Sequence, residues 1–185
     1  MPARASKVFM IVYFLRHASA GTKASDPKKD ERRPLDEDGV LQSRHIGRFL
    51  ATLGVEIEAV VSSPLKRALQ TASLAAGELS FDREVQIDDA LRPESEYSAF
   101  QSLLARLSKY ESVVIVGHNP SMTEFLSKAV SNGEMAAHLE LKKGAVAKVE
   151  MNGSTGTLNW LVTPKIARTL QSSVKLSSRP KTSRK

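Results

Sequence analysis

Val8-Phe9-Met10-Ile11-Val12-Tyr13-Phe14-Leu15 is an unbroken apolar run, and Arg16-His17 follows it at once. Apolar residues without alternation are typical of a central strand that is covered on both faces of a sheet. The run is too short to span a bilayer, and no cleavage region of small residues follows it directly, so we expect neither a membrane span nor a leader. We predict a buried first strand with Arg16 and His17 at its carboxyl end.

Two later segments repeat this order of a strand followed by a polar motif. Residues 59–62 predict a short strand that leads into Ser63-Pro64, where Ser63 would cap a helix and Pro64 would take its first position. Residues 112–116 predict another strand, which ends at Gly117-His118-Asn119-Pro120. Because ligands of open α/β sheets lie beyond the carboxyl ends of the strands, these motifs will meet if their strands are neighbours.

Helices are predicted between the strands from the spacing of their apolar residues. Asp36 would cap a helix that turns Ile46, Phe49, Leu50 and Leu53 toward the sheet. Further helices are predicted over residues 64–79, 95–109 and 120–130, and a hairpin over residues 145–151 and 157–162. This alternation indicates an α/β fold, a three-layer α/β/α sandwich with a mostly parallel central sheet and an antiparallel C-terminal edge hairpin.

Length and charge divide the 185 residues into one domain and a tail. The net charge is +7, and residues 165–185 hold seven bases and no acid, so the rest of the chain carries no net charge. We predict a domain over residues 1–164 and a basic, disordered tail over residues 165–185, which would aid solubility or bind a polyanion. The chain has no cysteine, which excludes disulfides and thiol chemistry and favours the cytoplasm.

The residues at the predicted strand ends suit phosphoryl transfer through a histidine. A neutral imidazole such as that of His17 can attack phosphorus, and arginine forks such as those of Arg16 and Arg67 match phosphate oxygens. Arg67 would also lie in the first turn of a helix, where free N–H groups favour an anion. His118 would donate a hydrogen bond to the phosphoryl group as charge spreads over its oxygens.

The order of these motifs resembles the histidine phosphatase superfamily, which has the phosphoglycerate mutase-like fold. Within it the chain is similar to the SixA-type phosphohistidine phosphatases in four features: Arg16-His17-Ala18, the block over residues 30–35 followed by Asp38-Gly39, Ser62-Ser63-Pro64 followed by Arg67-Ala68 and Gln70-Thr71, and a short segment before Leu91 where larger members place a cap domain. The resemblance covers residues 8–163 and leaves out the basic tail.

The resemblance implies roles for individual residues. His17 would accept the phosphoryl group and pass it to water, releasing inorganic phosphate without a metal or another cofactor. The phosphate pocket would be lined by Arg16, Arg33, Arg67 and His118. Arg32 competes with its neighbour Arg33 for the fourth position.

Three functions follow as hypotheses. The first is hydrolysis of phosphohistidine on a protein, such as a histidine phosphotransfer domain of a signalling or transport relay. The second is hydrolysis of small phosphate esters or of phosphoserine and phosphothreonine proteins, with Glu94 or Glu96 as general acid; alternatively, these glutamates complement a helix dipole. The third is a phosphate- or polyanion-binding module without catalysis.

The remaining histidines and the single tryptophan are expected to have structural roles. His45 flanks the packing face of its predicted helix, and His138 has no motif around it. Trp160 lies in the last predicted strand, where it would pack against the core or the sheet edge. Because the two motif histidines have no carboxylates or cysteines at ligand spacing, we predict no metal site.

Overall fold

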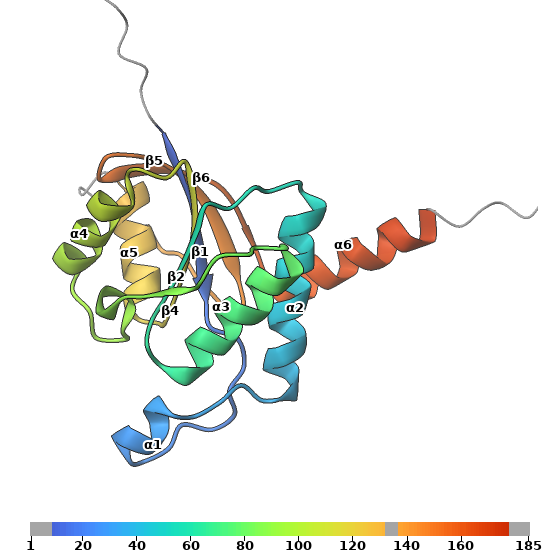
Figure 1. Cartoon of the computed structure of the whole chain (residues 1–185), viewed down its shortest axis with the longest axis horizontal. Coiled ribbons are helices and arrows are strands. Elements are labelled where there is room, and N and C mark those ends of the chain that lie inside the picture. Colours follow the sequence, from blue (N-terminus) through green and yellow to red (C-terminus); the bar gives the residue numbers. More distant parts are fainter. Residues whose placement is uncertain (1–8, 132–136, 178–185) are drawn as a thin grey trace, which may run out of the picture.

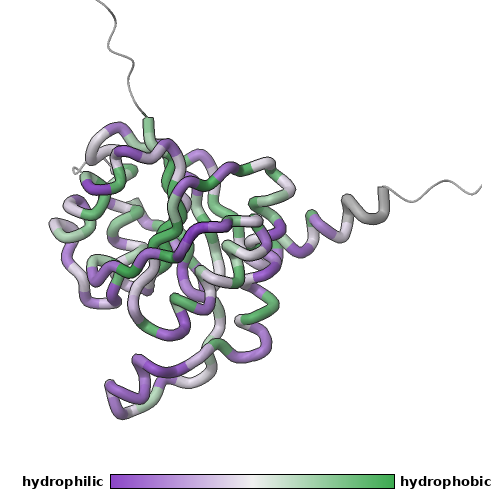
Figure 2. The backbone as a smooth tube through the Cα atoms, in the orientation of Figure 1, coloured by the Kyte–Doolittle hydropathy of each residue, from purple (hydrophilic) through white to green (hydrophobic). Residues whose placement is uncertain are grey.

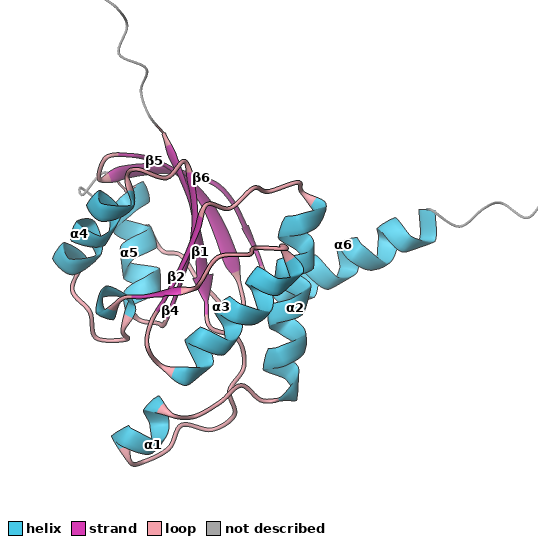
Figure 3. Ribbon diagram, viewed as in Figure 1, coloured by secondary structure: helices cyan, strands magenta, loops and turns pink. Residues whose placement is uncertain are grey.

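The computed structural model describes residues 9–131 and 137–177, and within these residues six strands form one sheet in the order β3-β2-β4-β1-β5-β6 (Figure 3). The strands are β1 (Met10–Arg16), β2 (Ala59–Ser62), β3 (Gln86–Ile87), β4 (Ser112–Gly117), β5 (Val146–Asn152) and β6 (Thr155–Val162). β1, β4, β2 and β3 pair in parallel, whereas β5 is antiparallel to both β1 and β6. The predicted parallel sheet with an antiparallel C-terminal hairpin is therefore confirmed.

Helices cover both faces of this sheet (Figure 1). They are α1 (Pro27–Glu31), α2 (Glu37–Thr52), α3 (Lys66–Glu78), α4 (Tyr97–Leu107), α5 (Ser121–Val130) and α6 (Pro164–Ser177), with a 3₁₀ turn over Asp89–Leu91. The side chains of β1 show how the layers are divided, since Val12 and Phe14 pack with residues of α4 and α5. Tyr13 and Leu15 pack with residues of α2 and α3 on the opposite face. The three-layer sandwich predicted from the sequence is thus confirmed.

The apolar residues gather in the strands and in the helix faces turned toward them, while α1 is hydrophilic along its length (Figure 2). Trp160 packs against Tyr13 and Phe49, with ring centroids 5.9 and 5.7 Å apart, as its predicted packing role requires. Leu53 is 50% exposed, contrary to expectation, because α2 ends at Thr52 and Leu53 lies beyond its last turn.

The start of α3 differs from the sequence prediction. Ser63 and Pro64 were expected to begin this helix, but it begins at Lys66, and Leu65 occupies the cap position without a side-chain hydrogen bond. The Ser63 amide instead donates to the Val116 carbonyl at 2.9 Å, which continues the pairing of β2 with β4 by one residue. The Ser63 hydroxyl contacts His118.

The predicted disordered tail is wrong over residues 165–177, which belong to α6. Ala167 is fully buried, and Gln171 donates to the His45 carbonyl on α2 at 2.8 Å. The His45 ring also contacts the Gln171 side chain at 3.2 Å, which supports the structural role expected for this histidine. The few apolar residues near the start of the tail are enough for one contact stripe. Residues 178–185 lie outside the described residues.

Within the described residues, none of the helices combines the length and apolar character needed to cross a bilayer.

Candidate active site

The three strands that carry the sequence motifs are neighbours, in the order β2, β4, β1. Their carboxyl ends meet at one edge of the sheet and open into a pocket of about 550 Å³. The predicted residues that line this pocket are Arg16, His17, Arg33, Arg67, Glu94 and His118. The topology therefore brings together side chains that lie far apart in the chain, such as Arg16 and His118.

His17 presents one bare ring nitrogen to this pocket. Its Nδ1 lies 2.7 Å from the Ala18 carbonyl oxygen, which only accepts hydrogen bonds, so Nδ1 carries the ring hydrogen. Nε2 then keeps a free lone pair. Burial lowers the pKa of His17 to about 3, and the charges of Arg67 and Arg16 act in the same direction, while the Ala18 carbonyl opposes them. The ring is therefore neutral at physiological pH, as a nucleophile must be.

His118 faces His17, with ring centroids 4.8 Å apart and an interplanar angle of 50°. The residue is only 1% exposed. Its Nε2 lies 2.9 Å from the Ser63 hydroxyl oxygen, and its buried Nδ1 has no hydrogen-bond partner among the described residues. Burial lowers the pKa of His118 to about 2, helped by His17 and by the Arg67 charge. Two neutral imidazoles therefore stand side by side.

Arg16 and Arg67 each use one nitrogen to hold the protein and leave another free. Arg16 Nη1 donates to the Leu141 carbonyl at 2.9 Å, and Arg67 Nη1 donates to the Asp30 carbonyl at 2.8 Å. The Nε atoms of both arginines are buried and have no hydrogen-bond partner among the described residues. Because buried N–H groups are rarely left unpaired, these donors are suited to an acceptor such as an anion.

Asp30 connects two of the pocket arginines. Its carboxylate accepts from Arg33 Nε at 2.9 Å and lies 3.3 Å from Arg67 Nη1, and the Ala24 amide donates to it at 3.1 Å. Burial alone would raise the pKa of Asp30, but the hydrogen bonds from Arg33 and Ala24 and the arginine charges outweigh burial and lower it. Asp30 is thus an ionised anchor for α1. Sequence reasoning missed this role, although the i, i+3 spacing of Asp30 and Arg33 was a local signal.

The structure separates the candidates that the sequence left open. Arg33 lines the pocket and also donates to the Ala20 carbonyl, whereas Arg32 is exposed and does not line it. Glu94 lies at the pocket rim, while Glu96 occupies the cap position of α4 and does not line the pocket. Both glutamates are exposed, and neither lies within α4. His138 is exposed and lies outside this pocket.

Comparisons with known proteins agree with this fold. The family description of the histidine phosphatase superfamily, branch 1, matches residues 12–106. The chain is 30% identical to phosphohistidine phosphatase SixA of Escherichia coli K12 over 158 residues, which cover 84% of this chain and 94% of that protein. The chain therefore belongs to the histidine phosphatase superfamily, and this membership supports a phosphatase.

Two further relatives extend the comparison. A solved structure of the protein histidine phosphatase SixA complexed with tungstate superimposes with a TM-score of 0.74 at 28% identity, covering 84% of this chain and 98% of that one. An uncharacterized protein of Picosynechococcus sp. is 36% identical over 143 residues, which are 74% of this chain and 82% of that protein. Both relatives are matched over most of their length.

Proposed function

We propose that this chain hydrolyses phosphohistidine on a protein, and that His17 is transiently phosphorylated during each turnover. The proposal rests on a neutral histidine with a bare Nε2 that lines the same pocket as His118 and the arginines. The similarity to SixA, a phosphohistidine phosphatase, supports the substrate class. The tungstate complex of a similar SixA structure also supports a site for a tetrahedral oxyanion.

The reaction proceeds in two displacements. In the first, His17 Nε2 forms a bond to phosphorus while the bond from phosphorus to the substrate imidazole breaks, and the departing imidazole keeps a proton. The Ala18 carbonyl holds the Nδ1 hydrogen of the phosphorylated His17 ring, which is then cationic. In the second, water attacks phosphorus, the bond to Nε2 breaks and its electron pair returns to the neutral His17 ring, and both water protons leave with the phosphate as H2PO4−. Arg16, Arg67 and His118 hold the phosphoryl oxygens throughout.

The acids around the pocket favour phosphohistidine over an alkyl ester. An alkoxide leaving group needs a proton from a nearby acid, whereas a protonated imidazole leaves without further help. Among the described residues that line the pocket, the acids are Asp30, Glu31 and Glu94. Asp30 is ionised between two arginines, and Glu31 pairs with Arg92 at 2.9 Å. Only the exposed Glu94 is left, at the rim.

The wall formed by residues 21–33 suits a protein substrate, because its acidic side chains are engaged within the protein whereas its exposed basic side chains are not. Asp26 caps α1 by accepting from the Lys28 amide at 2.8 Å, Asp30 is buried, and Glu31 pairs with Arg92. The exposed bases of this wall form no ion pair among the described residues: Lys23, Lys28, Lys29 and Arg32. An acidic surface around the phosphohistidine, as on a phosphotransfer domain, would be attracted to this wall.

The decisive experiment compares three substrates: a histidine-phosphorylated phosphotransfer protein, a phosphoserine peptide and a sugar phosphate. We expect phosphohistidine to be hydrolysed at least a hundredfold faster than either ester, with acid-labile phosphate trapped on the protein. His17→Ala should abolish both turnover and trapping, whereas His45→Ala, a matched control on α2, should keep them. Equal rates on an ester, or full turnover by His17→Ala, would overturn the proposal.

The ester hypothesis has its own test, because the two candidate acids lie differently. Glu94→Gln should reduce hydrolysis of an alkyl phosphate if Glu94 protonates the leaving group, while Glu96→Gln should not, since Glu96 does not line the pocket. For a phosphohistidine phosphatase, we expect both variants to retain turnover of phosphohistidine. A shared loss on both substrate types would instead indicate a role of Glu94 in binding.

A further inference from the structure

We propose that Ser63 is a positioning residue that sets the tautomer of His118, so that His118 offers an N–H group to the phosphoryl group. In this arrangement the Ser63 hydroxyl donates to His118 Nε2, and the ring hydrogen is carried by Nδ1. The inference rests on the proposed function for the identity of the bound group, but the tautomer itself is a property of the resting protein.

The surroundings of Ser63 fix the direction of this hydrogen bond. The residue is fully buried, directly after β2, and its oxygen lies 2.9 Å from His118 Nε2. The Leu65 amide donates to the same oxygen at 3.4 Å. An amide N–H cannot accept a hydrogen bond, so the Ser63 hydroxyl cannot donate to Leu65. Among the described residues, the acceptor available to the hydroxyl hydrogen is His118 Nε2. If Nε2 carried the ring hydrogen, the hydroxyl hydrogen would have no acceptor there.

The other edge of the ring leads to the same tautomer. His118 Nδ1 is buried without a partner among the described residues, and His118 lines the phosphate pocket. Ionised phosphoryl oxygens only accept hydrogen bonds, so a ring nitrogen that contacts them must carry a hydrogen. The buried ring is neutral and has only one hydrogen to place. Because the Ser63 hydroxyl donates to Nε2, that nitrogen needs no hydrogen, and the single ring hydrogen can lie on Nδ1.

The two histidines then use the same tautomer for opposite purposes. His17 carries its hydrogen on Nδ1, which the Ala18 carbonyl accepts, and turns the bare Nε2 toward the phosphorus. His118 carries its hydrogen on Nδ1 too, but the Ser63 hydroxyl occupies its Nε2, and the N–H edge is left for the phosphoryl oxygens. The Ala18 carbonyl thus leaves His17 with a bare Nε2 for attack, and the Ser63 hydroxyl leaves His118 with an N–H group for donation.

Nitrogen-15 NMR of the imidazole rings tests the tautomer directly in the full chain without substrate. We expect His118 Nδ1 to resonate as a protonated nitrogen and Nε2 as a bare one, with the signals assigned by their loss in His118→Gln. Adding orthophosphate should shift the Nδ1 hydrogen. A hydrogen on Nε2 in the wild-type protein would overturn the inference, whatever the enzyme hydrolyses.

Ser63→Ala tests the consequence for turnover. We expect kcat on phosphohistidine to fall about tenfold and the His118 tautomers to become mixed, whereas Ser43→Ala should change neither. Ser43 is the matched control because it is also buried, and its hydroxyl donates to the Gly39 carbonyl within α2. A wild-type tautomer and kcat in Ser63→Ala would overturn the inference. Where that variant does not fold, the wild-type spectrum decides.

These measurements also separate this inference from the proposed function. If the protein shows no phosphohistidine turnover while His118 carries its hydrogen on Nδ1, the proposed function fails and the tautomer assignment stands. If turnover is present while Nε2 carries the hydrogen, the proposed function stands and the role of Ser63 fails.

Discussion

Replacing Asp30 with asparagine tests how far one buried carboxylate holds the candidate pocket together. Asp30 is 8% exposed and contacts Arg33 and Arg67, whose side chains are 16% and 6% exposed. Removing one partner of a fully buried ion pair costs about 3–5 kcal/mol, because the remaining charge is left without compensation. Since the pocket admits water to these side chains, we expect Asp30→Asn to lose about 2–3 kcal/mol of unfolding free energy.

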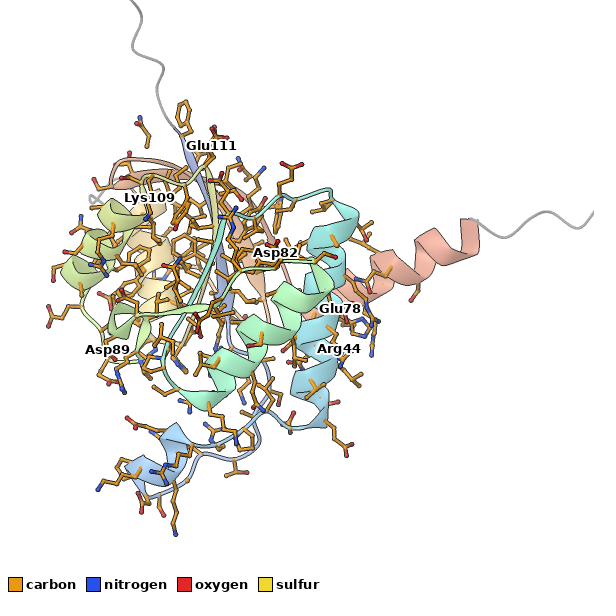
Figure 4. The ribbon with its side chains drawn as sticks, in the orientation of Figure 1. Arg44, Glu78, Asp82, Asp89, Lys109 and Glu111 are labelled. Atoms are coloured by element: carbon orange, nitrogen blue, oxygen red, sulfur yellow. The ribbon has the colours of Figure 1, made fainter. Side chains whose placement is uncertain are left out.

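Urea unfolding provides the assay, and Glu78→Gln provides the control. Glu78 on α3 lies near Arg44 of α2 (Figure 4), at 3.5 Å, and it also pairs with Arg48 of α2 at 2.8 Å. Those arginines are 48% and 50% exposed, so this surface network should contribute less than about 1 kcal/mol. If Asp30→Asn loses no more than Glu78→Gln at an unchanged m-value, the reasoning about the buried anchor is refuted.

The pH dependence of this difference has a definite sign. The pKa of Asp30 is lowered in the folded protein, so its stabilisation is present above the unfolded pKa of about 3.9 and is lost as the pH falls through the folded value. The unfolding free energy of the wild-type protein should therefore exceed that of Asp30→Asn by a constant amount between about pH 5 and 8. As the pH falls below about 4 toward the folded pKa, the two unfolding free energies should approach each other, and a difference that does not shrink would point to shape rather than charge.

Other expected outcomes address titration, the C-terminal helix and the basic wall. His118 stays neutral in the folded protein but titrates near pH 6.5 when unfolded. From pH 7 to 5 the unfolding free energy of the wild type, measured in urea, should therefore fall by about 2 kcal/mol more than that of His118→Asn. An equal fall in both proteins would contradict this. Deleting residues 165–185 removes the buried Ala167 and should lower the Tm by roughly 3–6 °C while turnover stays within twofold; lost turnover would place this segment in the site. Lys28→Glu with Lys29→Glu should raise KM for the phosphoprotein about tenfold at low salt but leave para-nitrophenyl phosphate hydrolysis unchanged; an unaltered phosphoprotein KM would exclude the wall from recognition.

The central strands could be predicted because burial on both faces requires an unbroken apolar run. β1 and β4 show this pattern, and the motifs at their ends fall around one pocket as expected. The roles of those motif residues stay predictions. The amphipathic helices were also accessible from spacing, although Leu53 shows that spacing alone does not locate the last turn that reaches the sheet.

Contacts between distant parts of the chain could not be predicted in the same way. Ser63 and His118 are 55 residues apart, and Arg67 and Asp30 are 37 apart, so no local period connects them. Ser63 also precedes a proline, which favours a cap interpretation until the strand is seen to continue through its amide. In α6, composition suggested disorder, but a docking surface on α2 compensates for the weak apolar character of the segment.

The attachment of α1 has a consequence for how the molecule opens. β1 is paired on both sides, with β4 and β5, so its amides exchange with solvent only when the whole sheet unfolds. α1 has five residues, too few to be stable alone, and its side chains are tied to the body through Asp30 and Glu31. Breaking those few ties frees the segment while the sheet stays folded. The candidate pocket therefore has a rigid floor and one wall that can open at a lower free energy than global unfolding.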